Sequence, residues 1–363
     1  MSKKLKVGIV YGGRSPEHNI SLLSAYNVVA NIDTNRWDPV LLPVDKEGIW
    51  YYHGSSAKID SPTDAATVRL TDLDQKIVLS QNYGQGNILD AQTGKVIESI
   101  DVIYPVMHGA FGEDGAIQGL AKMCGLPCVG CGILGSSLGM DKDVTKRLLR
   151  DADIGVADFV TLRKGYNEDL TFSEITAKLG EELFLKPANL GSSVGVKFTD
   201  NKSDYEKAVK EAFQYDPKVI VEEKITGREI ECAVLGNENP KASVIGEILP
   251  KTWYTFENKY IDDDGAGLAI PAKLSTEEAA KATKIAIDTY VNLECKGLTR
   301  VDMFLKENGD IIVNEVNTLP GFTKISMYPK LWENTGIEYQ DLISHLINFA
   351  LEDFDQQQNL KRQ

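Results

Sequence analysis

The stretch Asp302-Met-Phe-Leu through Ile311-Ile-Val-Asn-Glu315-Val-Asn317-Thr-Leu-Pro-Gly321 decides the fold of this chain. Its two β-rich runs flank the turn signal Glu307-Asn308-Gly309-Asp310, which predicts a β-hairpin. Glu315 and Asn317 point to the same face of an extended strand, and the hairpin brings Asp302 beside them. Three oxygen ligands on one wall suit Mg²⁺, which takes the rest of its shell from water and nucleotide phosphates. A solvated hairpin face is the alternative.

A second signal is the segment Phe184-Leu-Lys186-Pro-Ala-Asn-Leu-Gly191-Ser192-Ser193-Val-Gly195. A strand delivers a lysine, and a Gly/Ser-rich loop follows whose N–H groups and hydroxyls can hold a phosphate. The segment is not a Walker A motif, because three residues separate Gly191 from Gly195 and no Gly-Lys-Ser/Thr follows. A flexible surface hairpin is the competing interpretation. The lysine at the strand end, together with the candidate Mg²⁺ ligands, favours a phosphate-binding loop.

Composition narrows the class of protein. The chain has 363 residues, of which 42% are hydrophobic and 25% charged, as in an ordinary soluble protein of two or three domains. A net charge of -14 argues against a nucleic-acid partner, which requires a basic face. We expect no cleavable leader, because the first residues lack an apolar h-region, and no membrane span, because no apolar run approaches ~18 residues. We therefore expect a cytoplasmic protein without a membrane partner.

Several shorter patterns are interpreted as structural. Cys128-Val-Gly-Cys131 lacks the second ligand pair of a zinc site, so the five cysteines are interpreted as buried thiols. Gly130-Cys-Gly132-Ile-Leu-Gly135 matches G-x-G-x-x-G, but the strand before it is short, which disfavours a dinucleotide site. Asp262-Asp-Asp-Gly265 is interpreted as a solvated turn rather than a calcium loop. Aromatic residues at 253–260 indicate an edge strand or a lid over a site.

Strand and helix patterns alternate in the first part of the chain and become strand-rich in the last part. Ser15 and Pro16 predict the start of a helix that runs to about Ala30. Residues 53–97 have no clear pattern. The predicted strands are Lys6–Tyr11, Pro39–Val44, Asp101–Met107, Leu126–Val129, Leu183–Pro187, Lys218–Glu223, Glu229–Leu235, Ala242–Ile248, Leu298–Phe304 and Ile311–Glu315. Further helices are predicted after Met140 and near Ser203–Phe213, Ser275–Val291 and Glu338–Leu351.

These motifs together resemble the ATP-grasp superfamily and, within it, the D-alanine–D-alanine ligases. The match runs in order along nearly the whole chain. It is carried by the motifs at 12–17, 108–115, 140–142, 186–195, 222–229, 259–260, 300–302, 314–321 and 326–329. The block at 12–17 and the block formed by 314–321 with 326–329 are specific to the ligases, whereas the candidate metal ligands alone indicate only ATP-grasp.

The resemblance implies an N-terminal open α/β domain followed by a two-lobed, α+β ATP-grasp fold. The expected substrate-binding domain covers 1–139 and the central lobe 140–225. The C-terminal lobe, 226–363, carries the lid loop and the metal site. The implied activity is ATP-dependent joining of two D-alanines through a D-alanyl phosphate, with release of ADP and phosphate, for peptidoglycan synthesis. A homodimer is expected.

The resemblance also implies a role for each candidate residue. The ATP-binding set would be Lys142 and Lys186 with Ser192 and Ser193 at the phosphates, Glu222, Glu223 and Ile225 at the adenine, Glu229 at the ribose, and Lys259 at the γ-phosphate. Asp302, Glu315 and Asn317 would hold Mg²⁺ or Mn²⁺, with two ions expected. Glu17 would bind the ammonium group of the first D-alanine, linked by hydrogen bonds to Ser192 and Tyr260.

Four further positions complete the implied substrate site. Arg300 and the backbone N–H of Gly321 would form the oxyanion site, and Ser326 and Met327 would receive the carboxylate of the second D-alanine. His108 would lie near the substrates.

Acceptor choice is implied by the lid. Relatives that form D-alanyl-D-lactate carry other residues, such as phenylalanine, where this chain has Tyr260, so the dipeptide is expected. Met327 offers no basic group that would favour D-serine. Two rival functions remain. One is an ATP-grasp ligase for another carboxylate, which Glu17 and Ser326 disfavour. The other is a non-catalytic ATP-binding module, which would be expected to lack at least one of four residues that are all present here: Lys186, Arg300, Asp302 and Glu315.

Overall fold

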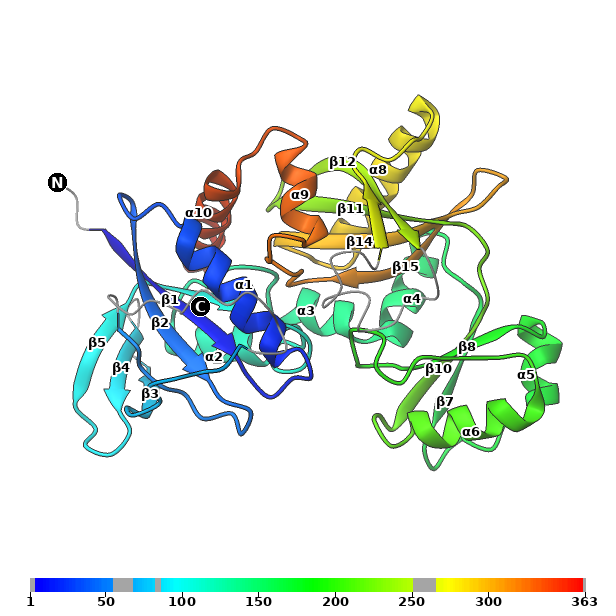
Figure 1. Ribbon diagram of the computed structural model, residues 1–363, viewed down its shortest axis with the longest axis horizontal. Helices are drawn as coiled ribbons and strands as arrows, with labels where there is room; N and C mark the ends of the chain where they lie inside the picture. The colour runs from blue at the N-terminus through cyan, green and yellow to red at the C-terminus, as the bar shows by residue number, and fades with distance from the viewer. Residues whose placement is uncertain (1–3, 55–67, 82–85, 251–265, 362–363) are drawn as a thin grey trace.

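The computed structural model describes residues 4–54, 68–81, 86–250 and 266–361 (Figure 1). The N-terminal part is built on a parallel sheet of order β2-β1-β6, as an open α/β layer requires. Its strands are β1 (Leu5–Gly12), β2 (Trp37–Val44) and β6 (Val102–Val106), and α1 (His18–Asn31) packs on β1. Their apolar runs are buried, which is typical of parallel strands covered on both faces.

Two N-terminal predictions need correction. The segment Leu126–Val129 forms only one parallel bridge, between Cys128 and Ile103, rather than a strand. The first helix begins at His18 instead of Pro16, because the residues before it form a turn in which the Ser15 hydroxyl accepts the Glu17 N–H at 3.1 Å.

A small antiparallel sheet of order β3-β4-β5 occupies part of the stretch that the sequence leaves unassigned. Its strands are β3 (Ile77–Ser80), β4 (Gly86–Asp90) and β5 (Val96–Ile100). Val78 and Val96 are exposed, so the strands do not show the alternation of apolar and polar residues that a half-buried sheet gives.

Helices α2 (Ala116–Cys124) and α3 (Ile133–Met140) follow β6. The G-x-G-x-x-G spacing serves packing here: a Cβ on Gly135 would lie 2.6 Å from the carbonyl oxygen of Glu294. All five cysteines are free thiols, as predicted, but only four of them are buried, because Cys128 is half-buried.

The central part is an antiparallel sheet of order β7-β10-β8-β9, with two helices on one face (Figure 1). The strands are β7 (Phe159–Arg163), β8 (Leu183–Pro187), β9 (Lys197–Thr199) and β10 (Lys218–Glu223), and the helices are α5 (Phe172–Leu179) and α6 (Lys202–Ala212). Helix α4 (Lys142–Asp151) precedes the sheet and begins at the N-cap Asp141, whose carboxylate accepts the Val144 N–H.

The C-terminal sheet has the order β13-β12-β11-β14-β15 and confirms the predicted hairpin, β14 (Gly297–Leu305) with β15 (Ile311–Asn317). Its other strands are β11 (Arg228–Gly236), β12 (Lys241–Pro250) and β13 (Ala266–Ala269). Alternation along β11 sends Ile230 and Val234 toward α8 (Thr276–Asn292) and Ala233 and Leu235 toward α9 (Met327–Glu333).

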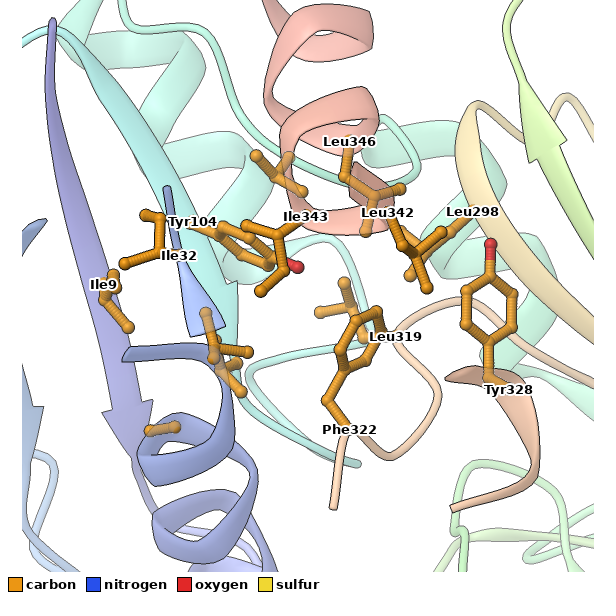
Figure 2. Close-up of a cluster of buried hydrophobic side chains, with 14 of the residues drawn as sticks. Ile9, Ile32, Tyr104, Leu298, Leu319, Phe322, Tyr328, Leu342, Ile343 and Leu346 are labelled. Atoms are coloured by element: carbon orange, nitrogen blue, oxygen red, sulfur yellow. The ribbon is translucent and has the colours of Figure 1, made fainter. Parts of the chain in front are cut away.

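The N-terminal and C-terminal parts share one hydrophobic core. Helix α10 (Tyr339–Gln358) inserts Leu342, Ile343 and Leu346 between Tyr104 on β6 and Leu298 on β14 (Figure 2). The indole N–H of Trp37 also donates to the Ser344 hydroxyl at 3.1 Å, across 307 positions of sequence. Among the described residues, no helix is long and apolar enough to cross a bilayer.

Candidate active site

A cavity of about 530 Å³ lies where the central sheet faces the C-terminal sheet. Strands β8, β10, β11, β14 and β15 and helix α4 all contribute lining residues. Nine sequence-predicted residues line it: Lys142, Lys186, Ser193, Glu222, Glu223, Ile225, Glu229, Asp302 and Glu315. Apolar side chains complete the wall, among them Phe184, Ile248 and Phe304. Motifs far apart in the sequence therefore meet around one space that combines charged and apolar surface.

A buried carboxylate between two lysines forms one side of this cavity. Lys186 Nζ lies 2.7 Å from Glu222 Oε2, and Lys146 Nζ lies 3.1 Å from Glu222 Oε1. Burial opposes charge on Glu222, but the two lysines lower its pKa to about 2. Burial also lowers the pKa of Lys146, against the attraction of Glu222. Lys186 additionally donates to the Asn314 side chain at 3.2 Å.

Sequence reasoning missed Lys146. The signal that reveals it is helical spacing: Lys142 and Lys146 are four residues apart on α4 and therefore share a face. Lys142 Nζ donates to the Leu190 carbonyl at 2.6 Å and lies 3.7 Å from Glu315 Oε2. Helix α4 thus contributes two cations to the cavity: Lys146 beside Glu222 and Lys142 beside Glu315.

The β14–β15 hairpin carries the predicted metal wall. Register pairs Asp302 with Glu315 and Arg300 with Asn317. The Arg300 guanidinium donates to both oxygens of Asp302 at 2.6 Å and lies 2.9 Å from the Glu231 carboxylate. The Asn317 amide donates to Asp302 at 2.9 Å. The hairpin therefore joins Arg300, Asp302 and Asn317 by hydrogen bonds and places Glu315 opposite Asp302 on the neighbouring strand.

This donor set fits a hard cation. The described residues contain no group of three His, Cys, Asp or Glu side chains arranged to hold a metal ion. The candidate set here consists of two carboxylates and one amide, and carboxylate and amide oxygens are suitable ligands for Mg²⁺. Three such ligands on two adjacent strands would leave part of the shell of the ion for nucleotide and water.

Glu17, at the start of α1, reaches the loop that follows β8. The Ser192 hydroxyl donates to Glu17 Oε1, and both side chains are buried. Ser192 and Ser193 have φ of 52° and 59°, a left-handed conformation that costs free energy in residues with a Cβ. The contact with Glu17 helps hold this conformation. Lys259 and Tyr260, with the aromatic run at 253–260 and the turn Asp262–Gly265, lie outside the described residues.

His108 is fixed to the backbone of the segment that contains Gly321. Its Nδ1 lies 2.9 Å from the Leu319 carbonyl, so this nitrogen carries the hydrogen, and its Nε2 lies 3.0 Å from the Ser24 hydroxyl. The Phe322 N–H donates to the same hydroxyl at 3.3 Å. Burial lowers the pKa of His108, which favours this neutral form. Ser24 is a second site residue that the sequence did not reveal.

Gly321 and Ser326 are in close contact. A Cβ on Gly321 would lie 2.8 Å from the Ser326 hydroxyl, so a side chain at this position would displace it. The Ser326 hydroxyl accepts the Thr323 N–H at 3.0 Å, and Met327 follows as the first residue of α9. Gly321, Ser326 and Met327 therefore form one compact turn.

Glu113 supports the same turn from the N-terminal part. Its carboxylate accepts the Gly109 N–H at 2.8 Å and the Leu319 N–H at 2.9 Å. Desolvation, together with the negative charge of Glu17, raises the pKa of Glu113 to about 7. Glu113 lies within the motif at 108–115, from which no role was predicted for it.

We expect Glu113 to make stability depend on pH. Because its folded-state pKa is raised, its contribution is complete below the ordinary value of 4.5 and is lost as the pH rises to about 7. The thermal midpoint of the wild type should fall over this range more steeply than that of Glu113→Ala. Thermal unfolding at a series of pH values measures both slopes, and equal slopes would contradict the assignment. His108 contributes a slope of opposite sign in both proteins.

Comparison with known proteins gives one family. A family model described as "D-ala D-ala ligase N-terminus" matches residues 6–131, and one described as "D-ala D-ala ligase C-terminus" matches 148–348. The chain is 47% identical over 362 residues to a D-alanine–D-alanine ligase of Shouchella clausii, covering 99% of this chain and 98% of that relative.

Solved structures agree. The D-alanine–D-alanine ligase from Coxiella burnetii superposes with a TM-score of 0.82 at 34% identity, over 98% of this chain and 97% of the other. The ligase from Bacillus anthracis complexed with ATP gives a TM-score of 0.72 at 27% identity, over 97% and 99% of the two chains.

Proposed function

The chain belongs to the D-alanine–D-alanine ligase family, and we propose that it joins two D-alanines at the expense of ATP to supply a peptidoglycan precursor. The main observation behind this proposal is that the lysine-lined cavity is bordered by the hairpin that carries Arg300 and Asp302. Such a site offers charge neutralisation for phosphoryl transfer beside donors for an acyl oxyanion. Because ATP is the phosphoryl donor, we propose a cytoplasmic reaction.

ATP would occupy the 530 Å³ cavity. Lys142 and Lys186, with the loop serines Ser192 and Ser193, would hold the phosphates, and Lys259 would reach the γ-phosphate. Glu222, Glu223 and Ile225 would line the adenine pocket, and Glu229 would bind the ribose hydroxyls. The apolar wall of Phe184, Ile248 and Phe304 supports a flat base on this side.

Asp302, Glu315 and Asn317 would hold Mg²⁺ or Mn²⁺, with two ions proposed. A bound cation of this kind neutralises phosphate charge during transfer. Lys142, 3.7 Å from Glu315, would add a fixed positive charge on the same side of the cavity. Arg300 orients Asp302 through both carboxylate oxygens, so the ligand wall and the oxyanion site are coupled.

The chemistry has two steps. A carboxylate oxygen of the first D-alanine attacks the γ-phosphorus. The bond between the γ-phosphorus and the oxygen that bridges to the β-phosphate breaks, and ADP leaves. The unprotonated amino group of the second D-alanine then attacks the acyl carbon, the bond from this carbon to the phosphate oxygen breaks, and the proton lost by the nitrogen leaves with the phosphate. Glu17 would bind the ammonium group of the first substrate, while Arg300 and the Gly321 N–H stabilise the tetrahedral oxyanion.

Ser326 and Met327 would receive the carboxylate of the second D-alanine. Their place in one turn with Gly321 supports a short path between acceptor and oxyanion sites. His108 would act through the backbone of this turn rather than on a substrate, since both of its ring nitrogens are engaged by Leu319 and Ser24.

We also propose a division into three domains, 1–139, 140–225 and 226–363, supported by the separate sheets in these ranges. A homodimer is proposed through α2 and α3. These helices expose an apolar face formed by Leu120, Met123, Ile133 and Leu134. Sedimentation of the wild type and of Met123→Glu tests this face, since only the substitution should give monomers.

The activity test is incubation of the purified protein with ATP, Mg²⁺ and D-alanine, followed by mass spectrometry of the products. D-alanyl-D-alanine is expected, and none is expected from L-alanine. ADP without dipeptide would redirect the proposal to another acceptor or carboxylate. Absence of ADP in all tubes would overturn the ligase proposal.

Replacing Tyr260 with phenylalanine should change acceptor choice. In a mixture of D-alanine and D-lactate, we expect the ratio of D-alanyl-D-lactate to dipeptide to rise by about tenfold, because the substitution removes the hydroxyl that the family resemblance links to Glu17. Liquid chromatography of the two products measures the ratio. Tyr166→Phe, at a side chain that is 84% exposed, is the control. An unchanged ratio would remove Tyr260 as the selector.

A further inference from the structure

Lys146 has no role in the proposed function, yet it lines the same cavity as the ATP-binding residues. Its side chain is 2% exposed and that of its partner Glu222 is 4% exposed. A buried lysine is rarely kept without a specific charge partner, because desolvating an ammonium group is costly. Here one carboxylate contacts two lysines.

Lys186 and Lys146 each contact a different oxygen of the Glu222 carboxylate. Oε2 is 2.7 Å from Lys186 Nζ, and Oε1 is 3.1 Å from Lys146 Nζ. Lys186 and Glu222 lie on adjacent antiparallel strands, where Lys186 pairs with Ile220 and Glu222 with Phe184, so both side chains point to the same face. Lys146 approaches from helix α4, on the other side of the carboxylate.

Lys186 already contacts Glu222 and Asn314, so a phosphate that binds it would compete with Glu222 for its positive charge. An entering polyphosphate brings negative charge next to a carboxylate that is already buried. Loss of every partner would leave that carboxylate uncompensated, which is strongly unfavourable in a buried site. Lys146 removes this conflict, since it neutralises Glu222 from the opposite oxygen and leaves one net positive charge in the trio.

We propose that Lys146 is a positioning residue for the nucleotide: it keeps Glu222 paired while Lys186 turns from Glu222 to a phosphate group of ATP. This inference rests on the proposed function of the cavity. It assigns Lys146 no contact with ATP, and it predicts that the effect of removing Lys146 depends on the presence of the Glu222 carboxylate.

The test is a double-mutant cycle on the full-length enzyme. Lys146→Met should raise the KM for ATP and the Kd for ADP by about tenfold while leaving the KM for D-alanine unchanged, because Lys186 is then retained by Glu222. In the Glu222→Gln background the same substitution should change the KM for ATP less than about twofold. Lys146→Arg should restore most of the affinity, since it retains the charge. Lys202→Met, at a side chain 74% exposed, is the matched control.

Three outcomes overturn the proposal. A lower thermal midpoint with unchanged ADP affinity would make Lys146 a structural residue only. An equal loss of affinity in the Glu222→Gln background would mean that Lys146 contacts the nucleotide directly. Failure of Lys146→Arg to restore affinity in a folded protein would remove charge as the cause. Absence of ADP binding by the wild type would instead contradict the proposed function itself.

Discussion

Replacing Arg300 with lysine is expected to lower kcat by about 1,000-fold, the upper range for loss of an oxyanion donor. Lysine retains the positive charge but not the planar fork that Arg300 directs at both oxygens of Asp302. The lost geometry affects two functions, because Arg300 would donate to the oxyanion and also orients a proposed metal ligand.

Steady-state rates of dipeptide formation with saturating ATP and D-alanine measure this effect. Arg228→Lys is the matched control, since Arg228 makes the same two-point contact with Glu247 at 2.7 Å and has no proposed catalytic role. A kcat within tenfold of the wild type for Arg300→Lys would exclude Arg300 from the oxyanion site. Arg300→Ala is unsuitable, because it leaves Asp302 and Glu231 without this buried partner and would destabilise the fold by roughly 3–5 kcal/mol.

Glu17→Gln should lower kcat/KM for D-alanine by about 100-fold, as expected for loss of a charged hydrogen bond to the substrate ammonium group. The amide keeps the size of the side chain and can still accept from the Ser192 hydroxyl. Affinity for ADP should stay within twofold, because Glu17 does not line the cavity that would hold ATP.

Ser192→Ala tests the contribution of the serine separately from that of the Glu17 carboxylate. It removes the contact with Glu17 but leaves the carboxylate, so about a tenfold loss is expected in kcat/KM for D-alanine. Titration of D-alanine at fixed ATP measures both variants. A larger loss for Ser192→Ala than for Glu17→Gln would show that the serine, rather than the carboxylate, dominates binding of the first substrate.

The sequence predicted the hairpin and most strands because these segments follow local rules. The run from Gly297 to Asn317 consists of two β-rich segments around a glycine-containing turn. Ser275 caps α8 through a capping box with Glu278, which is a start signal of helices. The failures at Leu126–Val129 and in the stretch 53–97 have a different cause. There, short segments take their pairing from distant neighbours, so local pattern carries little information.

The residues of the candidate site likewise divide into those that could be predicted from the sequence and those that could not. Side chains that a resemblance names, such as Glu17 and Ser192, were predictable although 175 positions separate them. Lys146 and Glu113 were not, because each acts on another residue: Lys146 on the Glu222 carboxylate, and Glu113 on the Leu319 N–H. Supporting contacts of this kind appear only when helix α4 or the segment 108–115 is seen against its partner in space.

The core that α10 shares with the N-terminal sheet has a consequence for synthesis of the chain. Tyr104 and Trp37 are buried against residues that the ribosome adds some 200 to 300 positions later. Closing so long a loop costs entropy before any contact is gained, and high contact order of this kind slows folding. The nascent N-terminal sheet therefore keeps an apolar face uncovered until α10 emerges. Chaperone binding during translation should concentrate on that face, and release should coincide with synthesis of α10.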